Sequence, residues 1–493
     1  MNYVSTRDNS VSVPSARAIG LGISKDGGLF LPESIPSLTK EDIDALVKAD
    51  YKGRAKIVLR KFLTDFTEEE LDYCVEGAYT GSFDEELPAP IYALDRTVGI
   101  LELWHGPTCA FKDLALQILP YLLTTSAKKI DSGKIVILVA TSGDTGKAAL
   151  EGFKNVKGTD IIVFYPSDGV SAMQKLQMDS QEGDNVCVCA IKGNFDDAQS
   201  RVKEIFTDKQ MAEKLAEGGY VFSSANSINW GRLVPQIVYY VSAYCDMLSV
   251  GTDLENGFNV TVPTGNFGNI LAAYYAKEMG VPINKLICAS NQNNVLTDFI
   301  NTGVYDRNRA FHTTMSPSMD ILISSNLERM IYMLSGCDDK QVTEWQNALK
   351  SEGRFEVTDD VKGKIKDIFY GGCCDDEKTK STIKETYEKY GYLLDTHTAV
   401  AVAVYNEYRE KTGDTTPAII ASTASPYKFA NSVLDALEIE ENGDDFQKLA
   451  TLSKATNTPI PAPISALKGK ERRFGEVIDR DEMRDAVCKY LKI

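Results

Sequence analysis

Residues 135–147 read Ile-Val-Ile-Leu-Val-Ala-Thr-Ser-Gly-Asp-Thr-Gly-Lys, a short β-branched run followed by a turn rich in glycine and hydroxyl groups. An apolar run of this length predicts a buried strand, and residues 147–154 are long enough for a helix to follow it. Similar runs recur at 161–165, 186–190, 260–262, 286–288 and 418–421. Strands that alternate with helices predict an α/β protein, in which parallel sheets carry helices on both faces.

The predicted strands fall mainly into two blocks, roughly 130–225 and 255–330, and we therefore expect two α/β lobes. Residues 1–84 differ, because acidic helix starts at Thr39 and Thr67 predict a mainly helical N-terminal module. The remaining residues, 85–493, form the two-lobed body. Within it the charge-rich stretch 337–390 predicts a helical insertion with a solvated face.

Composition limits the partners that this chain can have. The net charge is −17 and the pI is about 4.8, so the average field repels nucleic acid and anionic lipid. An anionic substrate would need a locally basic or amide-lined pocket. Hydrophobic residues at 43% and charged residues at 25% are typical of a folded globular protein.

The cysteines, histidines and apolar runs point to a reduced, soluble protein. None of the ten cysteines forms a C-x-x-C pair, and the three histidines are widely separated, so neither a disulfide framework nor a zinc site is expected. The N-terminus lacks a secretory signal, and the apolar runs are far shorter than the roughly 18 residues that span a bilayer. We predict a cytoplasmic protein without a metal, either a monomer or a homodimer.

Residues 264–269, Thr-Gly-Asn-Phe-Gly-Asn, lie between a predicted strand and a helix that starts near Ile270. The glycines let the backbone approach a ligand, and the first amides of a helix are unpaired donors at its positive end. The segment therefore predicts a cradle for an anion such as a phosphate. It matches neither the G-x-G-x-x-G nor the Walker A pattern, and a plain strand-to-helix turn is the alternative.

The turn at 140–147 also joins a strand to a helix. Its Gly146-Lys147 resembles the end of a P-loop, but Thr141 replaces the glycine and Ala148 follows the lysine. The hydroxyl groups of Thr141, Ser142 and Thr145, with the amides of the helix start, favour a seat for a carboxylate.

Residues 104–113, Trp-His-Gly-Pro-Thr-Cys-Ala-Phe-Lys-Asp, place Lys112 directly before a predicted helix and among apolar neighbours. Burial and the helix dipole both disfavour the ammonium form, which makes this amine a candidate nucleophile for an aldehyde. A lone lysine is more often a surface residue. The preceding Gly-Pro turn, the strand-like run 99–103 and the two other ligand-shaped loops favour the functional interpretation.

Taken together, these segments resemble the signature motifs of the threonine synthase family. The resemblance rests on His105-Gly-Pro-Thr-x-x-Phe-Lys-Asp113, on 141–146 and on 264–269, and it extends to 5–7, 26–33, 226–232, 316–321, 391–398 and 422–429 in the expected order. It implies the tryptophan synthase β-like architecture, fold type II of the pyridoxal-phosphate enzymes. It also implies a carbon–oxygen lyase that converts O-phospho-L-homoserine and water to L-threonine and phosphate, the last step of threonine biosynthesis.

The resemblance also implies residue roles. Lys112 would hold pyridoxal 5'-phosphate as a Schiff base and then move protons, and Thr423 would meet the pyridine nitrogen. The cofactor phosphate would be held by Gly265, Asn266, Phe267, Gly268 and Asn269. The amino-acid end of the substrate is assigned to the 141–146 turn, with Thr141, Ser142, Asp144 and Thr145. Arg232, with Ser227 and Asn229, is the candidate for the substrate phosphate, because guanidinium groups match phosphate geometry; the alternative is a structural pairing role for Arg232.

This chain departs from the family pattern at a few positions. Ser425 and Tyr427 stand where the family has His and Ala, and Thr396 replaces a proline before His397. We expect His397 and His312 to be packed structural residues, and His105 to orient the lysine motif. Two alternative functions stay open: another fold-type-II enzyme, such as a serine or threonine dehydratase or an O-acetylserine sulfhydrylase, or a catalytically silent relative that binds the cofactor or a phosphorylated metabolite.

Overall fold

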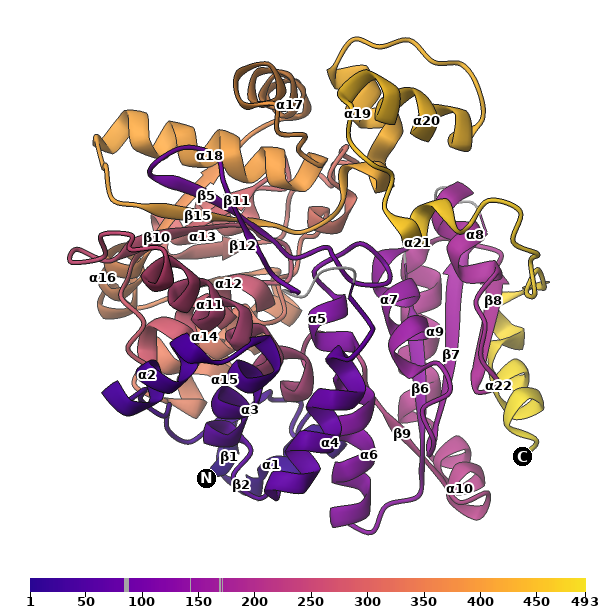
Figure 1. The fold of residues 1–493 in the computed structure, drawn as a ribbon. Helices are drawn as coiled ribbons and strands as arrows, with labels where there is room; N and C mark the ends of the chain where they lie inside the picture. The colour runs from indigo at the N-terminus through magenta and orange to yellow at the C-terminus, as the bar shows by residue number, and fades with distance from the viewer. Residues whose placement is uncertain (84–87, 142, 168–169, 171) are drawn as a thin grey trace.

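Two parallel sheets organise the chain, which is described here by a computed structural model of all residues except 84–87, 142, 168–169 and 171 (Figure 1). The six-stranded sheet has the order β14-β11-β10-β15-β5-β4, and only β4 runs antiparallel to its neighbour. The five-stranded sheet has the order β16-β8-β7-β6-β9, with all strands parallel. Both sheets confirm the predicted fold class of two α/β lobes.

The strands of these sheets have the following bounds. The six-stranded sheet contains β4 (Ile91–Ala93), β5 (Val98–Glu102), β10 (Phe258–Pro263), β11 (Ile283–Ser290), β14 (Phe369–Cys373) and β15 (Ala418–Ser422). The five-stranded sheet contains β6 (Lys134–Ala140), β7 (Thr159–Pro166), β8 (Val186–Ile191), β9 (Tyr220–Ser223) and β16 (Val477–Ile478). β7 and β10 are buried along their whole length, because helices cover both faces of a parallel sheet.

Helices flank both sheets (Figure 1). The lobe of the five-stranded sheet carries α7 (Asp144–Phe153), α8 (Ala172–Asp179), α9 (Phe195–Thr207), α10 (Lys209–Glu217) and α22 (Met483–Leu491). The body around the six-stranded sheet carries α11 (Trp230–Ser249), α12 (Gly268–Glu278), α13 (Val295–Thr302), α14 (Leu327–Leu334) and α18 (Thr396–Thr412). Between the lobes, α5 (Asp113–Leu116) packs against α7 and α11, and α6 (Leu119–Lys129) packs against β6 and α11. α11 is apolar on nearly all sides and is almost completely buried, so it forms the centre of the core.

The N-terminal region contains the helices α1 (Ser15–Leu21), α2 (Lys40–Lys48), α3 (Tyr51–Phe62) and α4 (Glu68–Tyr79). Capping boxes at Thr39 and Thr67 begin α2 and α4, as the acidic starts predicted. The region also forms a small antiparallel sheet of β1 (Asn2–Ser5), β2 (Asp8–Pro14) and β3 (Phe30–Pro32), which the sequence did not predict. These strands are short and β2 is largely polar, so they carry little of the periodic apolar signal.

The stretch 337–390 is mostly helical, with α15 (Asp339–Ser351), α16 (Asp359–Ile368) and α17 (Asp376–Tyr390). It also holds β13 (Arg354–Glu356), which pairs with β12 (Val304–Asp306), and β14, the edge of the six-stranded sheet. β14 reads Phe-Tyr-Gly-Gly-Cys, a poor strand signal. Its glycines are needed for packing, because a Cβ at Gly372 would lie 2.6 Å from Val404.

The C-terminal part returns to the five-stranded sheet. After β15 the chain passes through the 3-10 helix η2 (Pro426–Phe429), α19 (Ala430–Ala436), α20 (Asp445–Thr456) and α21 (Ala462–Ser465), then adds β16, η3 (Arg480–Glu482) and α22 beside β8 (Figure 1). Within the part of the chain that the structure describes, no helix has the length and apolar character needed to cross a membrane.

The topology brings the predicted loops together. β15 lies between β10 and β5, and all three run parallel, so their carboxyl ends share one edge of the sheet. The turn 264–269 follows β10, Thr423 follows β15, and the lysine segment follows β5. Ligands of α/β proteins bind at such carboxyl ends.

Candidate active site

Lys112 lies at the end of a loop that a buried carboxylate holds in place. Asp113 accepts hydrogen bonds from the amide (2.8 Å) and the hydroxyl (2.7 Å) of Thr108. A Cβ at Gly106 would come within 2.5 Å of Asp113, so a glycine is required there. Burial raises the pKa of Asp113 to about 6, although the bonds from Thr108 oppose this shift.

The amine of Lys112 has a depressed pKa. Burial lowers it to about 8; Asp144 and Asp113 oppose this shift, whereas Lys428 and Arg232 add to it. The Nζ lies 6.0 Å from the centroid of the Phe111 ring. The lowered pKa raises the neutral fraction of this amine near neutral pH, which suits it to attack an aldehyde.

The turn after β10 presents its amides on one side. Ser324 Oγ donates to the Gly265 carbonyl (2.7 Å), and Asn326 donates to the Asn266 carbonyl from its amide (3.1 Å) and its Nδ2 (3.2 Å). In a trans peptide the N–H points away from the C=O, so the amides of Asn266 and Phe267 face the opposite side. They join the unpaired amides at the start of α12.

Steric features of the same turn suit a closely bound anion. Phe267 has φ 63° and a buried ring that packs on Phe369, so its backbone and not its side chain faces a ligand. A Cβ at Gly265 would lie 2.9 Å from the Ser318 carbonyl oxygen. Asn269 Oδ1 accepts from Tyr239 (2.8 Å) and Tyr240 (2.5 Å), while its buried Nδ2 has no partner among the described residues. These features fit a phosphate group.

Thr423 is buried next to the lysine loop. Its carbonyl accepts a hydrogen bond from the Phe111 amide (2.9 Å), and Ala424 pairs with Ala110 in an isolated antiparallel bridge. The strand end β15 and the lysine segment are therefore fixed to each other.

A buried ion pair, which the sequence analysis missed, joins the two lobes at the lysine. Lys428 Nζ lies 2.8 Å from Asp144 Oδ1, and the two side chains are 3% and 5% exposed. The same Nζ donates to the Thr108 carbonyl (2.8 Å). Burial raises the pKa of Asp144, but Lys428 and Lys112 outweigh it and hold this pKa well below its usual range. Lys428 lies within the motif 422–429, which was the only available signal.

The hydroxyl group of Thr141 holds the backbone of the 140–147 turn in its conformation. Thr141 Oγ1 accepts from the amides of Gly143 (3.0 Å) and Gly146 (2.9 Å). Gly143 has φ 145°, and a Cβ there would lie 2.3 Å from Gln174. Thr145 is half-buried, and Ser142 lies outside the described residues.

Lys147 does not act as a P-loop lysine in this arrangement. Its Nζ pairs with Glu151 (3.0 Å) and donates to Gln181 (2.5 Å). The polar contacts of this ammonium are therefore made within its own lobe, in agreement with the rejected P-loop match.

Arg232 is a buried guanidinium with an incomplete set of partners. Its Nη1 donates to the Ala225 carbonyl (2.5 Å), and its Nε has no partner in the described parts of the chain. No carboxylate of those parts forms an ion pair with it. Burial lowers its pKa to about 10. A cation buried in this way suits an anionic ligand better than the structural pairing considered above.

The two residues predicted to accompany Arg232 differ from each other. Asn229 caps α11 by accepting from Gly231 (2.9 Å), and its Nδ2 donates to the carbonyls of Ile19 (3.0 Å) and Ser224 (2.9 Å). Its amide is thus committed to the fold. Ser227 Oγ accepts one bond, from Asn326 (3.3 Å), and retains a proton to donate.

The three histidines differ in burial and in their partners. His397 is buried between Asp395 (3.0 Å to Nδ1) and the Ser318 amide (3.1 Å to Nε2), and His105 Nε2 lies 2.8 Å from Glu102. The prediction of a packed His312 was wrong, because this residue is exposed on a loop that lacks a regular apolar pattern.

The two residues that depart from the family pattern are both buried. Ser425 begins η2 by accepting from the Tyr427 amide (3.4 Å), and the Tyr427 hydroxyl donates to the Thr458 carbonyl (2.7 Å). The tyrosine therefore ties η2 to the segment after α20.

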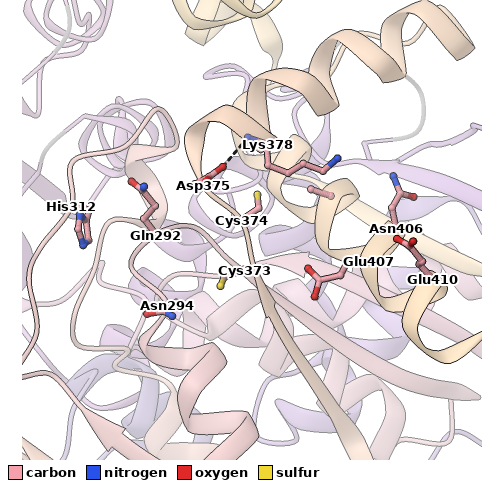
Figure 2. Close-up of a pocket in the computed structure, with 11 residues that line it drawn as sticks. Gln292, Asn294, His312, Cys373, Cys374, Asp375, Lys378, Asn406, Glu407 and Glu410 are labelled. Carbon is pink, nitrogen blue, oxygen red and sulfur yellow. Dashed lines mark hydrogen bonds between the residues drawn. The ribbon is translucent and has the colours of Figure 1, made fainter.

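A separate cavity of about 650 Å³ lies beyond the ends of β11 and β14 (Figure 2). Asp375, Glu407 and Glu410 contribute carboxylates to its wall, with Lys378 as the one ammonium among its lining residues. None of the predicted site residues lines it.

Three protein-family models match consecutive parts of the chain. Residues 2–79 match the model for the threonine synthase N terminus, 86–357 the model for pyridoxal-phosphate dependent enzymes, and 398–487 the model for the threonine synthase C-terminal region. The crystal structure of pyridoxal-phosphate-bound threonine synthase from Brucella melitensis superimposes with a TM-score of 0.89 at 36% identity, over 100% of both chains.

Two curated relatives extend the comparison. Threonine synthase of Pseudomonas aeruginosa is 39% identical over 88% of this chain and 90% of its own length. Human threonine synthase-like 1 is 43% identical over 86% of this chain, and the match spans 58% of the human protein.

The fold and the match over residues 86–357 assign the chain to the fold-type-II class of the pyridoxal-phosphate-dependent enzyme family. Within that class, the chain belongs to the threonine synthase family.

Proposed function

We propose that this protein is a threonine synthase, which converts O-phospho-L-homoserine and water to L-threonine and phosphate. A phosphorylated substrate needs a second anion site besides the cofactor phosphate seat. The observation that supports the proposal is Arg232, a buried guanidinium with an unpartnered Nε that is close enough to Lys112 to lower its pKa. Ser227 would add a hydroxyl donor to that site.

The residue roles follow from the same geometry. Bound pyridoxal phosphate supplies the electron sink that stabilises carbanions of the substrate. Its phosphate would lie on the amides of Gly265, Asn266, Phe267, Gly268 and Asn269. The Thr423 hydroxyl would meet the ring nitrogen, and a neutral hydroxyl does not hold a proton there, so proton movement depends on a well-placed base.

Lys112 would be that base. With a pKa near 8, the amine accepts and returns protons near neutral pH. We propose that it removes protons from Cα and then Cβ of the substrate, and that protons return to Cγ once the phosphate has left and to Cα once water has added. Water then adds at Cβ after the phosphate has left. The turn with Ser142, Asp144 and Thr145 would hold the amino-acid end, and the Thr141 hydroxyl would keep that turn in shape.

The test measures phosphate and threonine formed from O-phospho-L-homoserine by the purified holoenzyme. Lys112→Ala should abolish turnover and the absorption band of the bound cofactor together, whereas Lys192→Ala, an exposed lysine of the other lobe, should change neither. Pyruvate release from serine without phosphate release from O-phosphohomoserine would assign the chain to the dehydratases instead.

A catalytically silent, cofactor-binding relative is the second candidate, favoured by the 43% identity to a human protein named threonine synthase-like 1. A normal cofactor band with no turnover of O-phosphohomoserine would support it. We further propose a cytoplasmic location, supported by the finding that no disulfide joins the described cysteines, and a boundary near residue 84 between the N-terminal module and the catalytic body.

A further inference from the structure

The ammonium of Lys428 joins three segments that are distant in sequence. Asp144 begins α7 in the lobe of the five-stranded sheet, and Lys428 lies in η2, directly after β15 of the six-stranded sheet. The third segment is the lysine loop, reached through the Thr108 carbonyl. One side chain therefore fixes both lobes relative to the loop that carries Lys112.

A contact of this kind is a poor way to stabilise a fold. Desolvation of two charges offsets most of their attraction in the interior, and apolar replacements of buried pairs are often neutral or stabilising. The partners of Lys428 are the carboxylate of Asp144 and the carbonyl oxygen of Thr108, and Thr108 belongs to the loop that carries Lys112. The pair is therefore better suited to arranging charge at the site than to adding stability.

The charges that face Lys112 show what this arrangement achieves. The carboxylates of Asp144 and Asp113 favour the ammonium form of Lys112, whereas Lys428 and Arg232 disfavour it. Asp113 is engaged by Thr108, so Asp144 is the carboxylate that could turn toward Lys112. Lys428 and Gln174 hold it instead, through bonds of 2.8 and 3.2 Å.

We infer that Lys428 is a positioning residue, which keeps Asp144 from pairing with Lys112 and so leaves the Lys112 nitrogen available to the cofactor. This inference rests on the family's cofactor and not on the proposed substrate.

The test is a pH titration of the cofactor absorption band in the holoenzyme, which follows the proton on the Lys112 nitrogen. Lys428→Met removes the positive charge that pairs with the Asp144 carboxylate. The carboxylate then favours the protonated form of the Lys112 nitrogen, so the midpoint of the titration should rise by about one pH unit. Asp144→Asn removes the attracting carboxylate, so the midpoint should fall. The double variant should have a midpoint close to that of the wild type. Lys428→Arg keeps the positive charge, so its midpoint should also stay close to the wild-type value.

Lys147→Met is the matched control, because Lys147 is also buried in an ion pair, with Glu151, on the same helix as Asp144. It should lower the melting temperature without moving the midpoint. The inference is overturned if Lys428→Met lowers the melting temperature and leaves the midpoint unchanged, as in the control. Should Lys428→Met not fold, an unchanged midpoint in Asp144→Asn would overturn it equally.

Discussion

Two arginines of the core, Arg232 and Arg329, differ in how completely they are hydrogen-bonded. Both are buried, burial lowers both pKa values to about 10, and neither forms an ion pair with a carboxylate of the described chain. Arg329 donates from each of its nitrogens: to the Phe30 carbonyl (2.9 Å), the Asn326 side chain (2.5 Å) and the Ile228 carbonyl (2.5 Å). Arg232 reaches one carbonyl and leaves its Nε without a partner among those residues.

The difference separates a structural charge from one that awaits a ligand. Arg329 ties the N-terminal region to the loop before α11, and it orients Asn326, which supports the phosphate turn. Its desolvation is offset within the fold. The desolvation of Arg232 is offset only in part, which is physically reasonable where an anion completes the site.

Of the two arginine variants, Arg232→Met should have the larger effect on catalysis. Removing a buried donor for a charged substrate group should lower kcat/KM for O-phospho-L-homoserine by about a thousandfold, equivalent to about 4 kcal/mol. The free energy of unfolding should change little or increase, because an unpaired buried charge is lost. Steady-state kinetics and urea unfolding of the same preparation give both values; a large loss of stability would make Arg232 structural after all.

Arg329→Met should have the opposite profile. It leaves buried acceptors unsatisfied, at roughly 1–3 kcal/mol for each group, so the free energy of unfolding should fall by about 3 kcal/mol. Urea titration measures this loss. The cofactor should also dissociate more readily, since Asn326 loses its support. Equal stabilities of the Arg232→Met and Arg329→Met variants would contradict the assignment of Arg329 to the fold and of Arg232 to a ligand.

Inorganic phosphate should distinguish the two arginines without any turnover. In the holoenzyme the cofactor occupies the turn 265–269, so added phosphate should bind at Arg232. At a hundred times its Kd it should stabilise the protein by about 2.7 kcal/mol, seen as a higher melting temperature. Arg232→Met should lose this shift and Ser227→Ala should keep most of it. A shift of full size in Arg232→Met would place the phosphate elsewhere.

The smallest expected effect is that of Ser227→Ala. One neutral hydrogen bond to the substrate phosphate contributes about 1 kcal/mol, so KM should rise a fewfold with kcat nearly unchanged. Asn229→Ala should instead lower stability by about 3 kcal/mol, through the lost helix cap and the two carbonyl groups left without a donor, and its KM should stay close to that of the wild type. Kinetics and melting curves of this pair test whether the two neighbours have separate roles.

The sequence predicted the sheets and the loops because their signals are local. The β-branched runs became β6, β7, β8, β10, β11 and β15, and each glycine-rich turn precedes the helix expected of it. Local signals could not find β14, whose glycines are required by Val404 and Ile300 on neighbouring elements. The predicted role of Asn229 as a ligand likewise depended on its motif, whereas its partners Ile19 and Ser224 emerge only on folding.

Contacts between residues distant in sequence explain the other features that the sequence did not predict. Lys428 and Asp144 meet across two lobes, and nothing near either residue in sequence indicates the other. Arg329 follows a glutamate at the start of α14, a pattern typical of an exposed helix end. Its burial depends on Phe30 and Trp230, which come from other parts of the chain.

The return of the chain to the five-stranded sheet affects how the protein is made on the ribosome. Val136, Leu138 and Ile162 of β6 and β7 pack in one cluster with Met483, Val487 and Leu491 of α22. These strands leave the ribosome early, but α22, which covers them, is synthesised last. In the same way β5 cannot pair with β15 until most of the chain has been made. Nascent chains should therefore present apolar strand faces to chaperones for most of translation, and the two lobes should mature nearly together.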